Sequence, residues 1–334
     1  MGLRLDDYRQ RTPMQRLGTP EGGAGPLRIL AFQREPQGDL ADDPNRWQRD
    51  LVPEARRPDD RVSSGEDATM DAAGQRILVT GGGSGIGRAV AVAMAQAGAR
   101  VLITGRRLAA LEETVALAGV TSGELELLPG DVQDAVAVRG AVDQIAERFG
   151  GIDGVVNAAG IVRIERSEDL TDEALLDVLD TNLVGAFRVT REAGRHMLAA
   201  RSGSIVHIGS LAGLGGFPGR LAYAVSKHAL TGLVRTLAAE WGPSGVRVNA
   251  VAPGFVRTPM NDRAAASGAL DLDALVLRTP ARRRAEPEEM VGPIQFLLSP
   301  AASFVTGEIL LADGGWRAQS GLVNEYSAPR QDSA

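Results

Sequence analysis

Cysteine is absent from this 334-residue chain, which excludes disulfide bonds, thiolate nucleophiles and cysteine ligands for metals. Histidine is scarce: the chain has three, His196, His207 and His228, scattered along the sequence. We interpret all three as structural or surface residues and predict no metal site. The sequence also lacks an apolar run of ~18 residues and a charged-then-apolar leader, so we expect no membrane partner and a cytoplasmic location.

Aromatic residues and lysine are also limited. Aromatic side chains make up 4% of the residues and hydrophobic ones 44%, so the core must be aliphatic, as in a parallel sheet covered on both faces. The formal net charge of -6 provides no basic surface, and we expect no nucleic-acid partner. Lysine occurs once, at position 227, whereas the other 35 of the 36 basic residues are arginines.

Residues 1–69 differ in composition from the rest of the chain. They hold 7 of the 17 prolines, and 11 arginines against 13 acidic residues, without a persistent periodicity. Such a segment cannot bury enough apolar surface to offset the entropy of ordering it. We therefore predict a disordered extension over 1–71, a folded domain over 72–318 and a C-terminal tail over 319–334. Met70 opens an ordinary N-terminus for the domain, so a misassigned start codon explains the extension equally well.

Short apolar runs alternate with longer Ala/Leu/Val-rich stretches of helical periodicity from about residue 75 onward. The runs predict strands at 76–80, 100–105, 124–128, 154–160, 203–210, 246–253 and 308–315. Strand–helix–strand repeats at this spacing require right-handed crossovers between parallel strands. The sequence therefore predicts a single α/β domain, with a doubly wound parallel β-sheet and helices on both faces.

The stretch TGGGSGIG (80–87) follows the first predicted strand and opens the first predicted helix. Its glycines allow a tight turn and let a pyrophosphate approach the free N–H groups at the helix N-terminus. The strand before it and the helix after it are the context that a dinucleotide-binding loop requires. The predicted cofactor contacts in this loop are Thr80, Gly81, Ser84, Gly85, Ile86 and Gly87.

The second predicted strand ends at Gly105 and is followed by Arg106 and Arg107. A site that prefers NAD places a carboxylate here, to accept hydrogen bonds from the ribose 2′-hydroxyl. This chain lacks that carboxylate, and arginine can bind a 2′-phosphate with two parallel hydrogen bonds. We therefore predict NADP(H) as the favoured cofactor and NAD(H) as the alternative. Both arginines could instead be solvated residues that open a helix.

Two later strand ends complete the predicted cofactor site. The third predicted strand leads to Asp131 and Val132, which are placed to meet the adenine. The fourth ends in a segment that would pass beneath the cofactor, made of Asn157, Ala158, Ala159 and Gly160.

Tyr223 and Lys227 are four residues apart in an Ala-rich helical stretch, so they share one helix face. A phenol with a pKa near ~10 is a poor acid or base at neutral pH, and a neighbouring cation lowers that pKa. The phenol could then exchange a proton with a carbonyl or alcohol oxygen as a hydride moves. The alternative is a solvated pair. Because lysine occurs at this one position in an arginine-rich chain, we infer that the site requires a compact ammonium group.

Six motifs in order give the sequence a family pattern. They are TGGGSGIG (80–87), NAAG (157–160), Asn182 in DTNLVGAF, Ser210 in IVHIGS, YAVSK (223–227) and VAPGFVRT (251–258). From about Gly74 to Trp316 the chain resembles the compact, single-domain branch of the short-chain dehydrogenase/reductase family. The resemblance implies a Rossmann-type sheet, bound NAD(P)(H) and a catalytic tetrad of Asn182, Ser210, Tyr223 and Lys227.

The resemblance also implies a role for each of these residues. Tyr223 would be the general acid/base, and Lys227 would bind the nicotinamide ribose and lower the pKa of the tyrosine. Ser210 would hydrogen-bond the substrate oxygen, and Asn182 would help to hold a relay water. The nicotinamide amide and the lower phosphates would be lined by Pro253, Gly254, Val256 and Thr258.

Two positions depart from the family pattern. Ala158 replaces the second asparagine of the usual NNAG, which should cost little. Ser84 stands where many NADP-dependent members carry a basic residue, which weakens the prediction of NADP(H).

The implied activity is the interconversion of a ketone or aldehyde and an alcohol, with NAD(P) as the hydride acceptor. One alternative is a 3-oxoacyl-acyl-carrier-protein reductase. Another is a non-catalytic NADP-binding regulator, which we would expect to have lost part of the tetrad. An epimerase or dehydratase of the extended branch would carry a longer C-terminal substrate domain. The resemblance further implies a homo-oligomer, a tetramer or dimer, packed through the helices that carry Asn182 and Tyr223.

The substrate is a small molecule with a carbonyl or alcohol group. Small polar carbonyls and polyols rank slightly ahead of acyl carriers, because Arg195 suits acyl-carrier docking but Ala239 stands where a second basic residue is expected. The segment 259–284 lies where the family has its substrate lid. Arg278 and 282–284 within it either attract an anionic substrate or form a solvated or inter-subunit cluster.

Overall fold

The computed structural model describes residues 70–319 of the chain. Apart from positions 70, 71 and 319, the predicted extension and tail lie outside the described residues. The described part contains a seven-stranded sheet in the order β3-β2-β1-β4-β5-β6-β7, in which every neighbouring pair is parallel. The strands are β1 (Arg76–Thr80), β2 (Arg100–Gly105), β3 (Glu124–Pro129), β4 (Gly154–Asn157), β5 (Gly203–Ile208), β6 (Val246–Pro253) and β7 (Ile309–Ala312).

Helices connect the strands and cover both faces of the sheet. The helices are α3 (Gly85–Gln96), α4 (Leu108–Ala118), α5 (Ala135–Phe149), α6 (Asp172–Leu179), α7 (Ala186–Ala200), α8 (Leu221–Trp241), α9 (Pro259–Ala266), α10 (Leu272–Arg278) and α11 (Val291–Leu298). A π-helical turn, η2 (Asp180–Gly185), joins α6 to α7. The predicted fold class, a doubly wound α/β sheet, is confirmed.

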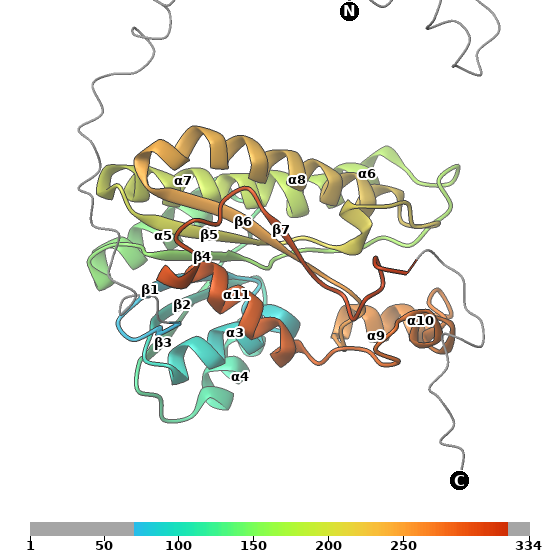
Figure 1. Cartoon of the computed structure of the whole chain (residues 1–334), viewed down its shortest axis with the longest axis horizontal. Coiled ribbons are helices and arrows are strands. Elements are labelled where there is room, and N and C mark those ends of the chain that lie inside the picture. The colour runs from blue at the N-terminus through green and yellow to red at the C-terminus, as the bar shows by residue number, and fades with distance from the viewer. Residues whose placement is uncertain (1–69, 320–334) are drawn as a thin grey trace, which may run out of the picture. The chain divides into compact units, whose positions relative to one another are not determined.

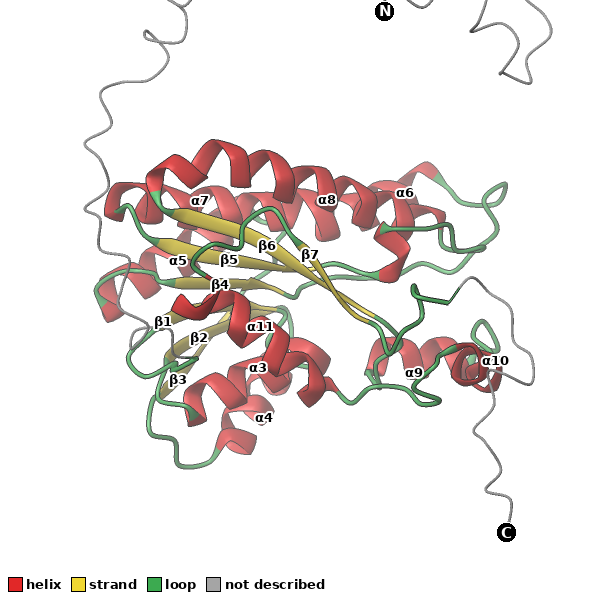
Figure 2. Cartoon of the chain, in the orientation of Figure 1, coloured by secondary structure: helices red, strands yellow, loops and turns green. Residues whose placement is uncertain are grey.

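The two faces of the sheet bury separate aliphatic cores. Helices α3, α4 and α11 pack on one face, where Met94 and Leu111 are fully buried with the strand residue Ile103 (Figure 2). Helices α5, α7 and α8 pack on the other face, where Ile145 and Met197 are buried. Parallel strands covered on both sides read as continuous apolar runs, which is how they were identified in the sequence.

The strand order reverses direction between β1 and β4. The Thr80 backbone lies opposite Thr104 of β2 on one side and Asn157 of β4 on the other. The connections leaving these neighbouring strands run to opposite faces of the sheet, so a crevice opens at their carboxyl ends. Helices α9 and α10 lie beyond the ends of the strands, on the side of this crevice (Figure 1).

A half-buried arginine joins the sheet to the end of α11. The Arg247 guanidinium on β6 donates to the carbonyl oxygens of Leu297 at 2.7 Å, Ser299 at 3.1 Å and Leu298 at 3.3 Å. A helix C-terminus leaves such carbonyls without intrahelical partners and with partial negative charge. Burial nonetheless lowers the pKa of Arg247 to about 10. The buried guanidinium therefore relies on these carbonyls as its hydrogen-bond acceptors.

Replacing Arg247 with methionine removes the donors while keeping most of the apolar stem. We expect the free energy of unfolding of Arg247→Met to fall by about 1–2 kcal/mol, because the Leu298 carbonyl loses its donor. The Leu297 and Ser299 carbonyls each lose one of two donors and keep those of Ser204 and Ala302. Urea unfolding measures the change. Arg235→Met, at an exposed arginine of α8, is the control and should change the free energy by less than about 0.5 kcal/mol. Equal losses in the two variants would contradict the role of Arg247.

Candidate active site

The carboxyl ends of the strands from β1 to β6 surround a cavity of about 470 Å³. Turns after β1, β2, β3, β4, β5 and β6 contribute to its wall, together with α8 and α9. Most of the residues predicted from the sequence line it: Gly81, Ser84, Gly85, Ile86, Gly87, Arg106, Arg107, Asp131, Val132, Ala158, Ala159, Gly160, Ser210, Tyr223, Lys227, Pro253, Gly254, Val256 and Thr258.

Three predicted residues, Thr80, Asn157 and Asn182, are buried behind the wall instead. The Thr80 hydroxyl accepts a hydrogen bond from the backbone N–H of Ala159 at 3.2 Å. The Asn157 side chain donates to the Thr190 hydroxyl at 3.0 Å. These side chains hold the turns after β1 and β4 in place, so they support the wall of the cavity from behind.

The glycines of the β1–α3 turn are required by close backbone contacts. A Cβ on Gly81, whose φ is +69°, would lie 2.7 Å from the backbone nitrogen of Ala159. A Cβ on Gly87 would lie 2.4 Å from the carbonyl oxygen of Gly81. Side chains at these positions would therefore push the turn away from α3 and β4.

The N-terminus of α3 faces the cavity with its backbone donors available. Ser84 is the N-cap residue, yet its side chain makes no capping hydrogen bond, and the first turn holds no acidic residue. Free N–H groups and the positive end of the helix dipole favour a phosphate. The glycine-rich turn and the uncapped start of α3 therefore fit a dinucleotide. The residues of this turn would hold its pyrophosphate.

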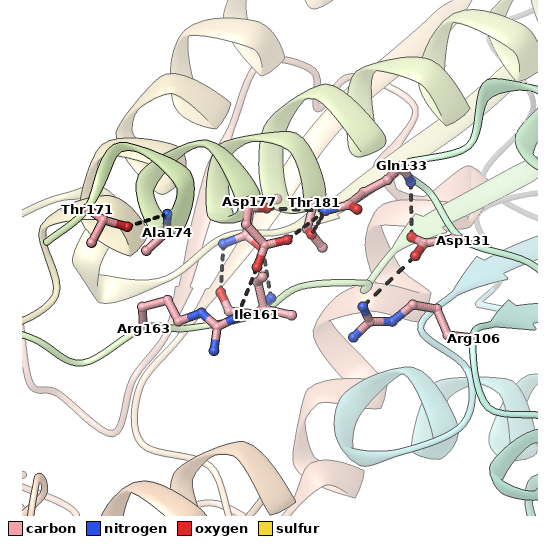
Figure 3. A network of polar contacts seen from close by, with 10 residues as sticks. Arg106, Asp131, Gln133, Ile161, Arg163, Thr171, Ala174, Asp177 and Thr181 are labelled. Atoms are coloured by element: carbon pink, nitrogen blue, oxygen red, sulfur yellow. Dashed lines mark hydrogen bonds and ion pairs between the residues drawn. The ribbon is translucent and has the colours of Figure 1, made fainter.

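The end of β2 carries an arginine that reaches across to the end of β3. Arg106 is exposed, and its guanidinium lies 3.9 Å from the carboxylate of Asp131 (Figure 3). The same carboxylate accepts a hydrogen bond from the Gln133 backbone at 3.0 Å. Asp131 is thus oriented by its own loop, with Arg106 only loosely paired to it.

A side-chain network fixes the loop after β3 (Figure 3). The Gln133 amide donates to the carboxylate of Asp177 at 2.9 Å and to the Thr181 hydroxyl at 2.8 Å. Arg163 also pairs with Asp177, at 3.1 Å. This network joins the adenine side of the site to α6 and η2. Gln133 was not identified from the sequence, because its partners Asp177 and Thr181 are distant in the sequence and only the structure brings them together.

Asn182 sits on the π-helical turn and is 1% exposed. Its amide accepts from the Ile161 backbone N–H at 2.8 Å and donates to the Ile161 carbonyl at 2.9 Å. It also donates to the Ser226 hydroxyl of α8 at 3.1 Å. The side chain therefore ties the loop after β4 to the helix that carries Tyr223. A role in holding a relay water stays a prediction.

Ser210, Tyr223 and Lys227 come together at the end of β5. The Lys227 ammonium is 6% exposed and donates to the Ile208 carbonyl at 2.6 Å, with its nitrogen 5.6 Å from the Tyr223 ring centroid. The Ser210 hydroxyl accepts from the Ala212 N–H at 3.1 Å and is hydrogen-bonded to the Tyr223 phenol. The predicted neighbours are therefore in contact around one edge of the cavity.

The protonation of these groups is set mainly by burial. Burial raises the pKa of Tyr223, while the hydrogen bond from Ser210 and the charge of Arg220 act in the opposite direction. Burial lowers the pKa of Lys227 to about 8. The fully buried His207 has its pKa lowered to about 3 by burial and by the charge of Lys227, so it is neutral near pH 7.

One part of this arrangement differs from the expectation. The sequence led us to expect that Lys227 lowers the pKa of Tyr223, whereas the cation that acts on the phenol in this structure is Arg220. The ammonium of Lys227 is instead directed at the Ile208 carbonyl. Arg220, the N-cap residue of α8, was not identified from the sequence.

Comparisons with known proteins identify the family to which the chain belongs. A family model described as enoyl-(acyl carrier protein) reductase matches residues 81–317. The chain is 38% identical over 261 residues to the short-chain reductase protein NovJ of Streptomyces niveus, covering 76% of this chain and 99% of that one. The chain belongs to the short-chain dehydrogenase/reductase family.

Two further relatives of this short-chain dehydrogenase/reductase are informative. Galactitol 2-dehydrogenase of Rhizobium johnstonii is 39% identical over 246 residues, covering 73% of this chain and 95% of its own. A crystal structure from Beutenbergia cavernae, assigned as an NAD(P)-dependent gluconate 5-dehydrogenase and containing NADP at low occupancy, superposes with a TM-score of 0.70. Its sequence is 41% identical, and the match covers 75% of this chain and 99% of that one.

Family membership gives the protein its reaction class. It is an oxidoreductase that acts on CH–OH groups with a nicotinamide cofactor. Within residues 70–319, no helix is both long and apolar enough to span a bilayer. The same residues contain no cluster of three or more potential metal ligands.

The cofactor cradle can be tested at Gly87. In Gly87→Ala the new Cβ would overlap the carbonyl oxygen of Gly81, so we expect NADPH affinity to fall at least about tenfold. Fluorescence titration of NADPH measures this. Gly140→Ala on α5 is the matched control, because its Cβ meets no atom within 4 Å. Unchanged affinity in Gly87→Ala would show that the turn does not hold the cofactor.

Proposed function

We propose that this short-chain dehydrogenase/reductase interconverts a ketone or aldehyde and an alcohol using NADP(H), with Tyr223 as general acid/base. The observation that carries the proposal is the contact between Tyr223 and Ser210 at the edge of the cavity, beside the buried ammonium of Lys227. A bound nicotinamide would supply or accept the hydride. The protein groups would orient the substrate oxygen and move its proton.

Each side chain has a physical basis for its proposed role. Since burial raises the pKa of Tyr223, the phenol is protonated near neutral pH and can donate to a carbonyl oxygen during reduction. Ser210, already hydrogen-bonded to that phenol, would share the same substrate oxygen. Lys227, with a pKa of about 8, is mostly cationic at pH 7 and would bind the nicotinamide ribose, while the charge of Arg220 favours the phenolate.

Removing the phenolic hydroxyl tests the mechanism. We expect Tyr223→Phe to reduce kcat/KM by about 10²–10⁴-fold while NADPH affinity stays within about threefold, because the ring remains and only the proton donor is lost. A spectrophotometric screen of ketones with NADPH, and of alcohols with NADP⁺, measures the activity. Turnover near the parent rate would reject Tyr223 as the acid/base. Full cofactor binding without any turnover by the parent protein would favour the non-catalytic regulator.

The choice of NADP(H) over NAD(H) is supported by the end of β2. Gly105 provides no carboxylate for a ribose 2′-hydroxyl, and the exposed Arg106 makes a loose contact of 3.9 Å with Asp131. Arg107 is also exposed and lines the cavity. Guanidinium groups with free donors match a phosphate well. NADP bound to the Beutenbergia relative agrees with this preference.

Reversing the charge at Arg106 tests the cofactor preference. We expect Arg106→Asp to lower the ratio of kcat/KM for NADP⁺ to that for NAD⁺ by about 10–100-fold, because a carboxylate repels the 2′-phosphate and accepts from the 2′-hydroxyl. Arg139→Asp, at an exposed arginine of α5 outside the cavity, makes the same charge change and should leave the ratio unchanged. An unchanged ratio in Arg106→Asp would refute the assignment of the 2′-phosphate to this residue.

Small polar carbonyls and polyols are the favoured substrates, and an acyl carrier is the second candidate. Arg195, which could meet an acidic carrier, is already paired with the buried Glu192. Ala239 and Glu240 are exposed on α8 and add no positive charge there. The galactitol and gluconate relatives act on small polyhydroxy compounds according to their names. The family model named for an acyl-carrier reductase keeps the second candidate open.

A homo-oligomer is also proposed, as a dimer or tetramer. Four large apolar side chains are exposed along η2, α7 and α8, which are the helical segments that carry Asn182 and Tyr223. They are Val184, Phe187, Leu221 and Val225. Exposed apolar groups gathered on neighbouring elements are typical of a protein interface.

A further inference from the structure

Arg220 occupies an unusual position at the substrate end of the cavity. It is half-buried and lines the cavity with Phe217 and Ile164. Among residues 70–319, no side-chain hydrogen bond or ion pair engages its guanidinium. Burial lowers the pKa of Arg220, so its charge is partly removed from water without a compensating anion. Five N–H donors are therefore available at this wall.

The backbone holds Arg220 in a defined place. The Arg220 N–H donates to the Phe217 carbonyl at 3.2 Å, and the Arg220 carbonyl accepts from the Ala224 N–H of α8 at 2.8 Å. The preceding Gly219 has a φ of +72°, and its carbonyl accepts from the Glu165 N–H at 2.9 Å. Arg220 is thus fixed between the start of α8 and the loop after β4, which is the arrangement of a preorganised binding group.

The charged residues of the cavity are divided between its two ends. The carboxylate that lines the cavity in the described structure is Asp131, which lies next to Arg106 at the cofactor end. The carboxylates on the segments near Arg220 do not pair with it: Asp177 is bound by Gln133 and Arg163. The substrate end therefore carries an uncompensated positive charge.

The arginine cluster of segment 259–284 is not at this position. Arg283 pairs with Glu289, and Arg284 pairs with Asp262. Arg278 lies 4.2 Å from the ring centroid of Trp316. None of these three lines the cavity, although Arg263 of the same segment does. The expectation that this cluster could attract an anionic substrate therefore has a better candidate in Arg220.

We propose that Arg220 binds the carboxylate of the substrate, so that the preferred substrates are short hydroxy acids and their oxo acids rather than neutral polyols. The proposal rests on the proposed function, because it concerns the same site. Arg220 is the N-cap residue of α8, Tyr223 lies in the first turn of that helix, and both line the cavity, so both can reach a molecule of a few carbons. The guanidinium of Arg220 can donate two parallel hydrogen bonds to one carboxylate, and the exposed Arg263 of α9 is a second arginine that lines the cavity.

The test compares acids with polyols that differ from them in one terminal group. We would measure kcat and KM with NADP⁺ for D-gluconate against D-glucitol, and for D-galactonate against galactitol. The parent protein should show a kcat/KM about tenfold or more higher for the acids. Arg220→Gln should lower the ratio of kcat/KM for the acids to that for the polyols by about 10–100-fold, through a rise in KM for the acids alone. Arg220→Lys should recover part of the loss, because lysine restores the positive charge but cannot donate two parallel hydrogen bonds to a carboxylate.

The controls separate binding from other effects. Arg139→Gln removes an exposed charge of α5 outside the cavity and should change neither substrate. Thermal melting and NADPH titration establish that each variant is folded. If Arg220 acted only through its charge on Tyr223, kcat would change equally for acid and polyol, which would overturn the proposal.

The remaining outcomes distinguish this proposal from the proposed function. A parent protein that prefers the polyols, or that accepts only phosphate esters of the same sugars, would overturn the role of Arg220 and leave the proposed function intact. A parent protein that binds NADPH but turns over no alcohol or carbonyl would refute the proposed function, and the carboxylate assignment with it.

Discussion

A single buried ammonium at the end of β5 ties α8 to the sheet and to the chemistry of the cavity. Lys227 is 6% exposed, and its nitrogen donates to the Ile208 carbonyl at 2.6 Å. This contact fixes the register of α8 against the strand ends, and the same helix then presents Tyr223 one turn earlier. A guanidinium is wider and planar and would not fit this contact in the same way. The one lysine of the chain therefore stands where its compact shape matters. Burial lowers the pKa of His207, and the charge of Lys227 adds to this effect, so the ring stays neutral.

The fold could be predicted because its determinants are periodic and local. Fully apolar runs predicted the buried strands, and β1, β2 and β6 have the predicted bounds. The glycines of the β1–α3 turn were identified because backbone contact at a dinucleotide loop excludes side chains. Strand ends were less accurate: β4 stops at Asn157 rather than at residue 160, since the following residues leave the sheet to form the cavity wall.

The rest of the site depends on contacts between segments far apart in the sequence. Asn182 was identified by family resemblance, but its partners, Ile161 and Ser226, lie on other elements. Gln133 has its role only because α6 brings Asp177 beside the loop after β3. Arg220 is a charged residue at the start of a helix, and only the structure of residues 70–319 shows that it lines a cavity without an ion pair among those residues. The residue pattern of a single sequence does not show which distant side chains contact one another.

The position of Arg220 also couples substrate charge to the proton on Tyr223. Burial raises the pKa of the phenol, and the charge of Arg220 acts against that rise. A carboxylate bound at Arg220 would neutralise much of this charge and expel water, so the pKa of Tyr223 would rise further. The phenol would then be protonated when an oxo acid is bound, as reduction requires. In the absence of an anion, the charge of Arg220 opposes burial, but the pKa of the phenol is still raised. The same interaction would therefore select an anionic substrate and prepare the proton donor for it.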